Sequence, residues 1–168
     1  MAIIIDKYAG KLQEDLTVPT STIKYPLGTE VVITDTTLTM RKRFKYVKAA
    51  HSALTAYVPY QIALGYTTGA EWATRAALKC TNSLVSVPQV AFASNYYGFV
   101  QIEGKCTAVG TSGFAAGDKL QLGNGLAVLS LCTTGADYAE SQACAITLTS
   151  TTVATQVVNL TGYRVTCT

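Results

Sequence analysis

The sequence has few charged side chains and no long run of apolar ones. Charged residues make up 14% of the 168 residues, hydrophobic residues make up 49%, and the net charge is +3. No apolar run approaches the ~20 residues that a membrane-spanning helix requires, so we expect no membrane partner. Because globular domains usually carry about 25% charged residues, we expect part of this surface to be hidden in contacts with other proteins.

Histidine is almost absent, and the cysteines form no recognisable pattern. The single histidine is His51, and there is no C-x-x-C pair among the five unevenly spaced cysteines, which are Cys80, Cys106, Cys132, Cys144 and Cys167. A zinc site needs several Cys or His ligands at characteristic spacings. We therefore expect no metal and no cofactor, and we interpret the cysteines as reduced, buried thiols of a protein made in a reducing cytosol.

The sequence also lacks a recognisable catalytic motif. His51 would have to serve as the base for any nucleophile, no G-x-S-x-G elbow is present, and the ten carboxylates are scattered singly. The run GTSGFAAGDK, residues 110–119, has the wrong spacing for a phosphate-binding loop and is interpreted as a turn. We expect a protein that is not an enzyme, and a small enzyme dependent on His51 is the third-ranked alternative.

The N-terminal region has no sustained hydrophobic period. Its apolar run extends only from Ala2 to Ile5, without a basic leader, so no secretory signal is expected. The segment LTVPTSTIKYPLG, which follows within the first 28 residues, contains two prolines. We predict an extended N-terminal arm over residues 1–28 and a single β domain over residues 29–168.

Thr, Val, Ala and Gly are abundant and occur in short alternating segments, a texture that favours strands. A first hairpin is predicted from TEVVITD, residues 29–35, to RKRFKYVKA, residues 41–49. Further strands are predicted at YVPYQIAL, SVPQVAFA, YGFVQIEG, KLQL, LAVLSL, CAITLT and YRVTC. The fold class is therefore all-β, either a β-sandwich or a barrel-like domain.

Two local signals refine this prediction. In KLQLGNGLAVL, Asn124 and Gly125 tolerate positive φ and can reverse the chain between two strands. In TTGAEWATRAALKCTN, Thr68 and Glu71 form a potential capping box before Trp72 and several alanines at helical spacing. We expect at most one short helix, located here, with Trp72 as its anchor on the core.

The stretch YYGFVQIEGKC, residues 96–106, carries apolar or aromatic side chains on both faces. Regular alternation places Tyr96, Val100 and Ile102 on one face and, on the other, Tyr97, Phe99, Gln101 and Glu103. A strand that is half covered by water has one polar face. We therefore expect this strand to contact protein on both sides, in two packed sheets or in one sheet against a neighbouring subunit.

Charge is concentrated in RKRFKYVK, residues 41–48, which holds five of the thirteen cations. As a strand it places Arg41, Arg43 and Lys45 on one face and Phe44 and Tyr46 on the other. This pattern predicts aromatic rings packed inward and cations outward, forming an ordinary solvated face or a patch that binds an acidic protein surface. Because the isoelectric point near 8.6 is modest, no nucleic-acid partner is expected.

Several blocks of the sequence resemble a known family when they are taken in order. They are YPLGTEVV, RFKYVKA followed by ALTAYVPYQIAL, YYGFVQIEGKCTAV and FAAGDKLQLGNGLAV. Over roughly residues 25–130 the chain resembles the small decoration, or cement, proteins on the heads of tailed bacteriophages. YGFVQIEG and AAGDKL carry most of the resemblance. Residues 65–82 and the C-terminal LTGYRVTCT depart from it, which leaves the strand topology open.

The resemblance implies a structural function. Such proteins bind the outer surface of an expanded capsid, often as trimers, and clamp adjacent capsomers against the internal pressure of the DNA. The implied partners are the major capsid protein and further copies of the chain in a homotrimer. The implied location is the outer surface of the capsid in the virion, after synthesis in the host cytoplasm.

The resemblance also suggests roles for particular residues. Glu103 would be a surface group near a turn. The candidates for the subunit interface are Tyr97, Phe99 and Gln101. The candidates for contact with the capsid are Arg41, Arg43 and Lys45 on the basic strand, and Ile3, Ile4 and Ile5 in the arm.

A trimeric tail-fibre or adhesin module is the alternative function. It would share the β texture rich in Thr and Gly, and the trimer, but it would bind a cell surface or a glycan through an exposed aromatic pocket.

Overall fold

The structure of the chain is a computed structural model. It describes residues 2–4, 15–35, 40–50, 52–62, 83–111, 113–122, 128–132, 144–150, 154–162 and 164–165. Over these residues the fold is all-β, as predicted, and helix is confined to a short stretch at residues 15–17. The helix expected around Trp72 lies outside the described residues.

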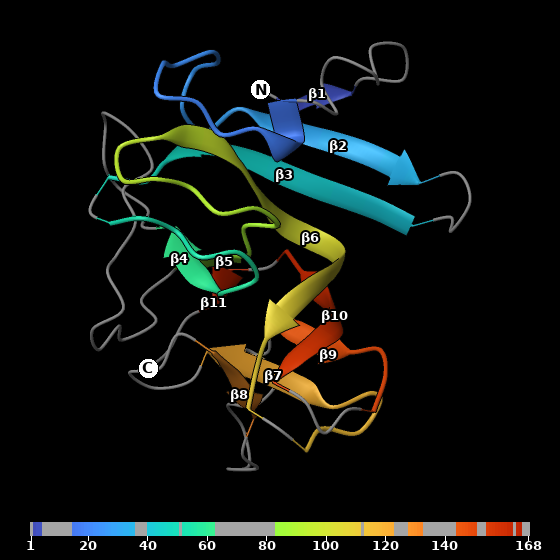
Figure 1. The fold of residues 1–168 in the computed structure, drawn as a ribbon. Coiled ribbons are helices and arrows are strands. Elements are labelled where there is room, and N and C mark those ends of the chain that lie inside the picture. The colour runs from blue at the N-terminus through green and yellow to red at the C-terminus, as the bar shows by residue number, and fades with distance from the viewer. Residues whose placement is uncertain are drawn as a thin grey trace.

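The strands divide between a large sheet and a small one (Figure 1). The large sheet has the order β1 (Ala2–Ile4), β2 (Glu30–Asp35), β3 (Met40–Lys48), β6 (Tyr97–Val109), β10 (Thr155–Thr161), β9 (Ala145–Thr147), β7 (Lys119–Leu122) and β8 (Leu129–Leu131). The small sheet has the order β11 (Arg164–Val165), β5 (Ser83–Ser86) and β4 (Tyr60–Ile62). Strands β1 and β2 pair in parallel, whereas the other pairs of named strands are antiparallel.

One end of the large sheet curls into a barrel-like unit. Gly110, which follows β6, forms a parallel bridge with Leu129 of β8, and the Thr111 backbone N–H donates to the Leu129 carbonyl over 2.9 Å. This bridge brings β8 back beside the end of β6. The interior of the unit is a cluster of buried side chains that includes Cys106, Phe114 and Leu160.

Strand β6 connects all parts of the core. Figure 1 shows it passing from beside β3 to the barrel-like unit that contains β10. Phe99 belongs to an aromatic cluster with Tyr46, whereas Val100 belongs to a cluster with residues of the small sheet. The prediction that this strand contacts protein on both faces is confirmed, and segments of the same chain provide both contacts.

Most predicted strands are present, although several are shorter than expected. The hairpin of β2 and β3 is confirmed, and so is the pairing of β7 with β8. The run SVPQVAFA was wrong as a strand, because only its first residue belongs to β5. Strand β10 was missed because buried Gln156 and half-buried Val157 obscure the alternation of TQVVNLT.

Residues 15–28 of the predicted arm fold back onto their own sheet. Leu16 joins the aromatic cluster, and Thr20 forms two backbone hydrogen bonds with Tyr97, at 2.8 and 2.9 Å. The Gly28 N–H donates to the Tyr46 carbonyl over 2.8 Å. This part of the arm therefore covers one face of the large sheet.

The first prediction concerns Gly104, whose φ is +90° and whose added Cβ would lie 2.2 Å from the Arg41 carbonyl oxygen. We expect Gly104→Ala to lower the free energy of unfolding by about 2–4 kcal/mol, because it adds backbone strain and a clash with β3. Gly113 is a matched control, since its φ is also +90° but nothing lies within 4 Å of its added Cβ. Urea unfolding of both variants is the measurement, and equal losses would contradict the prediction.

Candidate functional site

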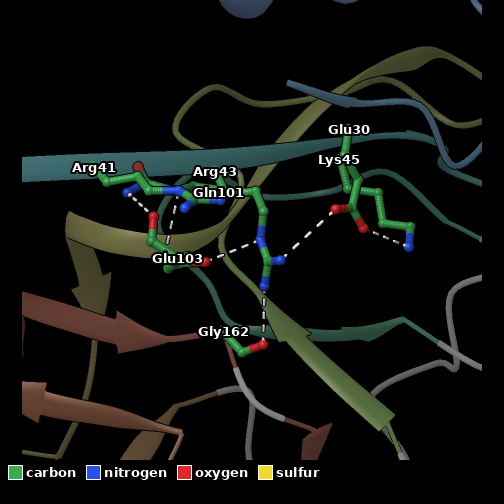
Figure 2. A network of polar contacts seen from close by, with 7 residues as sticks. All are labelled: Glu30, Arg41, Arg43, Lys45, Gln101, Glu103 and Gly162. Atoms are coloured by element: carbon green, nitrogen blue, oxygen red, sulfur yellow. Dashed lines mark hydrogen bonds and ion pairs between the residues drawn. The ribbon is translucent and has the colours of Figure 1, made fainter. Parts of the chain in front are cut away.

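The basic strand β3 is part of a network of ion pairs, shown in Figure 2. Arg41, Arg43 and Lys45 of β3 face Glu30 of β2 and Glu103 of β6. We call these five residues the charge network. It contains three cations and two carboxylates, so most of its charge is neutralised within the chain.

Arg43 is the centre of the charge network. Its Nε lies 3.0 Å from Glu103 Oε2, and its Nη1 lies 3.8 Å from Glu30 Oε2. Its Nη2 donates a hydrogen bond to the Gly162 carbonyl over 3.1 Å, which connects β3 to the turn after β10. Lys45 Nζ donates to Glu30 Oε1 over 3.2 Å. A single guanidinium thus joins groups on β2, on β6 and in the turn after β10.

A β-bulge places Glu103 within reach of Arg43. Phe44 pairs with Gln101, but the next pair is Arg43 with Glu103, so the register shifts between them. Adjacent residues of β3 point to opposite faces, and cross-strand partners share a face. Gln101 and Glu103 therefore lie on opposite faces of β6, and the regular alternation expected there was wrong beyond Gln101.

The three cations proposed for capsid contact differ in exposure. The Arg41 side chain is 58% exposed, and its Nε lies 4.0 Å from Glu103 Oε1. The side chains of Arg43 and Lys45 are 25% and 19% exposed, and both are engaged in ion pairs. The prediction that these side chains point outward into solvent is therefore confirmed for Arg41 and wrong for Arg43 and Lys45. Glu103, expected as a surface group, is half-buried in these pairs.

The apolar candidates at the N-terminus lie at the edge of the sheet. Ile3 and Ile4 belong to β1, where Ile3 pairs with Val31 and Ile4 with Val32. Ile5 lies outside the described residues. The structure therefore brings Ile3 and Ile4 to the same sheet as the basic strand, with β2 between them.

The candidates for the subunit interface are largely inside the chain. Phe99 and Gln101 are each only 2% exposed, so they were wrong as interface residues. Phe99 is covered by Tyr25 and Tyr46, with ring centroids at 5.4 and 5.0 Å, and the Gln101 amide donates to the carbonyls of Glu103 and Lys105. Tyr97 is half-buried, and Lys48 Nζ lies 5.7 Å from the centroid of its ring.

A second set of polar contacts, made by three side chains, holds residues 15–25 in place. The Asp15 carboxylate accepts a hydrogen bond from the Tyr25 hydroxyl over 2.6 Å and another from Lys24 Nζ. The hydrogen bond to Asp15, together with burial, raises the pKa of Tyr25 to about 12. The ring of Tyr25 also packs edge-on against Tyr46, with centroids 5.2 Å apart. We call these contacts of Asp15 with Lys24 and Tyr25 the clasp, and they hold residues 15–25 over the aromatic cluster.

Among the described cysteines, Cys106 and Cys132 are free thiols, and the Cys144 thiol donates a hydrogen bond to the Leu120 carbonyl. Cys106 and Cys144 are buried in the barrel-like unit, and Cys132 is half-buried. Burial raises the pKa of Cys106 to about 12 and also raises that of Cys132. Cys80, Cys167 and His51 lie outside the described residues. Among the residues that are described, no three His, Cys, Asp or Glu side chains are grouped to hold a metal ion.

Sequence reasoning missed the acidic half of the charge network. Glu30 could have been found, because continuing the predicted hairpin register places it opposite Lys45. No local pattern predicts the contact between Glu103 and Arg43, because this contact depends on the bulge. The clasp of Asp15 and Tyr25 was also missed, because nothing in the sequence indicates that the arm folds back.

Comparisons with known proteins give no relative: no family model, no curated protein and no solved structure matches the chain. Within the described part of the chain, no helix is long and apolar enough to span a membrane.

The second prediction separates Arg43 from Arg41. Arg43→Ala leaves two half-buried carboxylates and the Gly162 carbonyl without this partner, so we expect a loss of about 1–3 kcal/mol in unfolding free energy. Arg41→Ala removes an exposed contact and should cost less than about 1 kcal/mol. Urea unfolding at low and high salt measures both. Equal costs for the two variants would show that Arg43 is not the centre of the charge network.

The third prediction concerns alkaline pH. The pKa of Tyr25 is higher in the folded chain, about 12, than its ordinary value of 10, so folding favours the protonated phenol. The stability that the contact contributes is fully present below pH 10 and is lost as the pH rises from 10 towards 12. We expect Tyr25→Phe to have a shallower loss of stability over this range. Tyrosinate absorbance should show one late-titrating group that is missing in the variant, and identical profiles would contradict this.

Proposed function

We propose that the chain is a decoration protein of a tailed-phage head. In this function it binds the outer surface of the capsid and holds neighbouring capsomers together as a homotrimer, without catalysing a reaction. The major capsid protein is its partner, and the outer face of the virion is its location.

The main support for this proposal is the position in the fold of the sequence blocks that resemble the decoration proteins. RFKYVKA lies in β3 apart from its last residue, YYGFVQIEGKCTAV covers β6, and FAAGDKLQLGNGLAV contains β7. Side chains from these blocks contribute to all three buried clusters of the described residues. The resemblance therefore concerns the residues that build the core, and this supports a shared fold and, with it, the function proposed.

Arg41 is the best-placed cation for contact with the capsid. It is the most exposed member of the charge network, and Glu103 neutralises it only at 4.0 Å. Ion pairs at an exposed surface contribute about 0.2–1 kcal/mol each. A trimer would present three such contacts at once, and linked weak sites can raise the overall affinity by ~10² to 10⁴.

The fourth prediction tests this contact. Stripped capsids are incubated with wild type, Arg41→Glu or the control Lys119→Glu, which makes the same charge change at an exposed site on β7. We expect Arg41→Glu to weaken binding about 10- to 100-fold at low salt, because three copies of the contact are lost together. The difference should shrink at raised salt, and Lys119→Glu should bind as wild type does.

Two outcomes would change the proposal. If wild type fails to bind capsids and instead binds on a glycan array, the tail-fibre or adhesin function replaces it. If Arg41→Glu binds like wild type, Arg41 does not contact the capsid, and the proposed contact is then assigned to the N-terminus. Deleting residues 1–5 is then the matching test, because it removes Ile3, Ile4 and Ile5 but keeps the packed residues 15–28.

A further inference from the structure

Two neighbouring loops form a surface without charge. They comprise residues 52–58, between β3 and β4, and residues 88–95, between β5 and β6, and neither contains Asp, Glu, Lys or Arg. We call them the uncharged loop surface. Its exposed residues are mostly small, namely Ser52, Ala53, Thr55, Tyr57, Ala91, Ala93, Ser94 and Asn95.

The two loops are joined as a short antiparallel pair. Leu54 and Phe92 exchange backbone hydrogen bonds of 2.9 and 3.0 Å, and their side chains are buried in the cluster shared with the small sheet. In an antiparallel pair, the residues on either side of such partners point to the opposite face. Small residues therefore cover the outward face of the pair, and these are Ala53, Thr55, Ala91 and Ala93.

This surface is held rigidly on the core. The Phe92 ring lies so close to Gly98 of β6 that a Cβ added there would be 2.5 Å from it. The Asn95 N–H donates to the Ala49 carbonyl over 2.7 Å, and the Thr55 N–H donates to the Tyr60 hydroxyl over 2.9 Å. A surface that is already ordered loses little conformational entropy when it binds a partner.

Tyr57 protrudes from this surface in a strained conformation. Its φ is +66°, in the left-handed region that bulky residues rarely adopt, and 39% of the residue is exposed. Its backbone is fixed by hydrogen bonds to the Pro88 carbonyl and from the Val109 N–H, both 2.8 Å. Glycine would fit this backbone without strain. Retained strain is typical of functional sites, and exposed tyrosine is a common anchor of protein interfaces.

We propose that the uncharged loop surface is where copies of this chain meet around a symmetry axis, with Tyr57 as the anchor. Near such an axis identical residues of different copies face each other. Any charged side chain there would therefore face the same charge on another copy and be repelled by it. A different partner could match charges with opposite ones, whereas identical charges that face each other at the axis repel. Small side chains also let the backbones approach closely. This inference rests on the homotrimer of the proposed function and names its interface.

The experiment introduces charge at Ala93. Sedimentation velocity over a range of concentrations compares wild type with Ala93→Glu, Ala93→Lys and an equimolar mixture of the two variants. Ala116→Glu is the matched control, since Ala116 is an exposed alanine in the turn before β7. Near-UV circular dichroism checks that each variant is folded, which is expected because both alanines lie on the surface.

Wild type and Ala116→Glu should form the same oligomer at micromolar concentration. Each Ala93 variant alone should raise the dissociation constant at least tenfold, and the mixture should recover mixed oligomers because opposite charges then meet. A monomeric wild type, Ala93 variants that assemble like the control, or a mixture that does not recover would each overturn the proposal. Capsid binding is not part of this measurement, so a failed capsid contact and a failed self-contact are distinguished.

Tyr57→Gly tests the anchor separately. Removing the left-handed strain should leave the melting temperature of the dissociated chain, measured at high dilution, unchanged or higher, while the dissociation constant of the oligomer rises at least tenfold. A lower melting temperature with unchanged assembly would show that Tyr57 serves only the fold, and would overturn its role as an anchor.

Discussion

The two-sided burial of β6 determines how the other described strands are arranged around it. One strand supplies side chains to the aromatic cluster, to the cluster under the small sheet and to the interior of the barrel-like unit. A straight, regular strand has only two faces, so serving three clusters requires a bend. The bulge at Gln101 and the positive φ of Gly104 provide it.

The charge network follows from that bend. Once the register has shifted, Glu103 lies opposite Arg43, and Arg43 in turn reaches Glu30 and the Gly162 carbonyl. The two less exposed cations, Arg43 and Lys45, are thereby paired with carboxylates of the same chain. The basic strand is therefore mainly a structural element, and Arg41 is the member of its charge network that is most available to a partner.

Much of the fold could be predicted from local sequence. Alternation and β propensity were sufficient for the β2–β3 hairpin, for β6 and for the pairing of β7 with β8, because each depends on residues close together in the chain. Strand β10 was missed, since Gln156 is buried at a position where alternation predicts an apolar residue. The candidate site was predicted only in part, because exposure of Arg43 and Lys45 depends on Glu30 and Glu103.

Local sequence is enough to predict the all-β class and the two-sided burial of β6, because strand propensity and apolar periodicity are local properties. It does not predict which segments cover the two faces of β6, because these segments are distant in the chain. The same chain covers both, through the returning residues 15–28 and the small sheet, so Phe99 and Gln101 are unavailable to another subunit. Alternation predicts that a residue is buried. It does not predict which segment covers that residue, because this depends on long-range strand pairing and on one shift of register that no local pattern encodes.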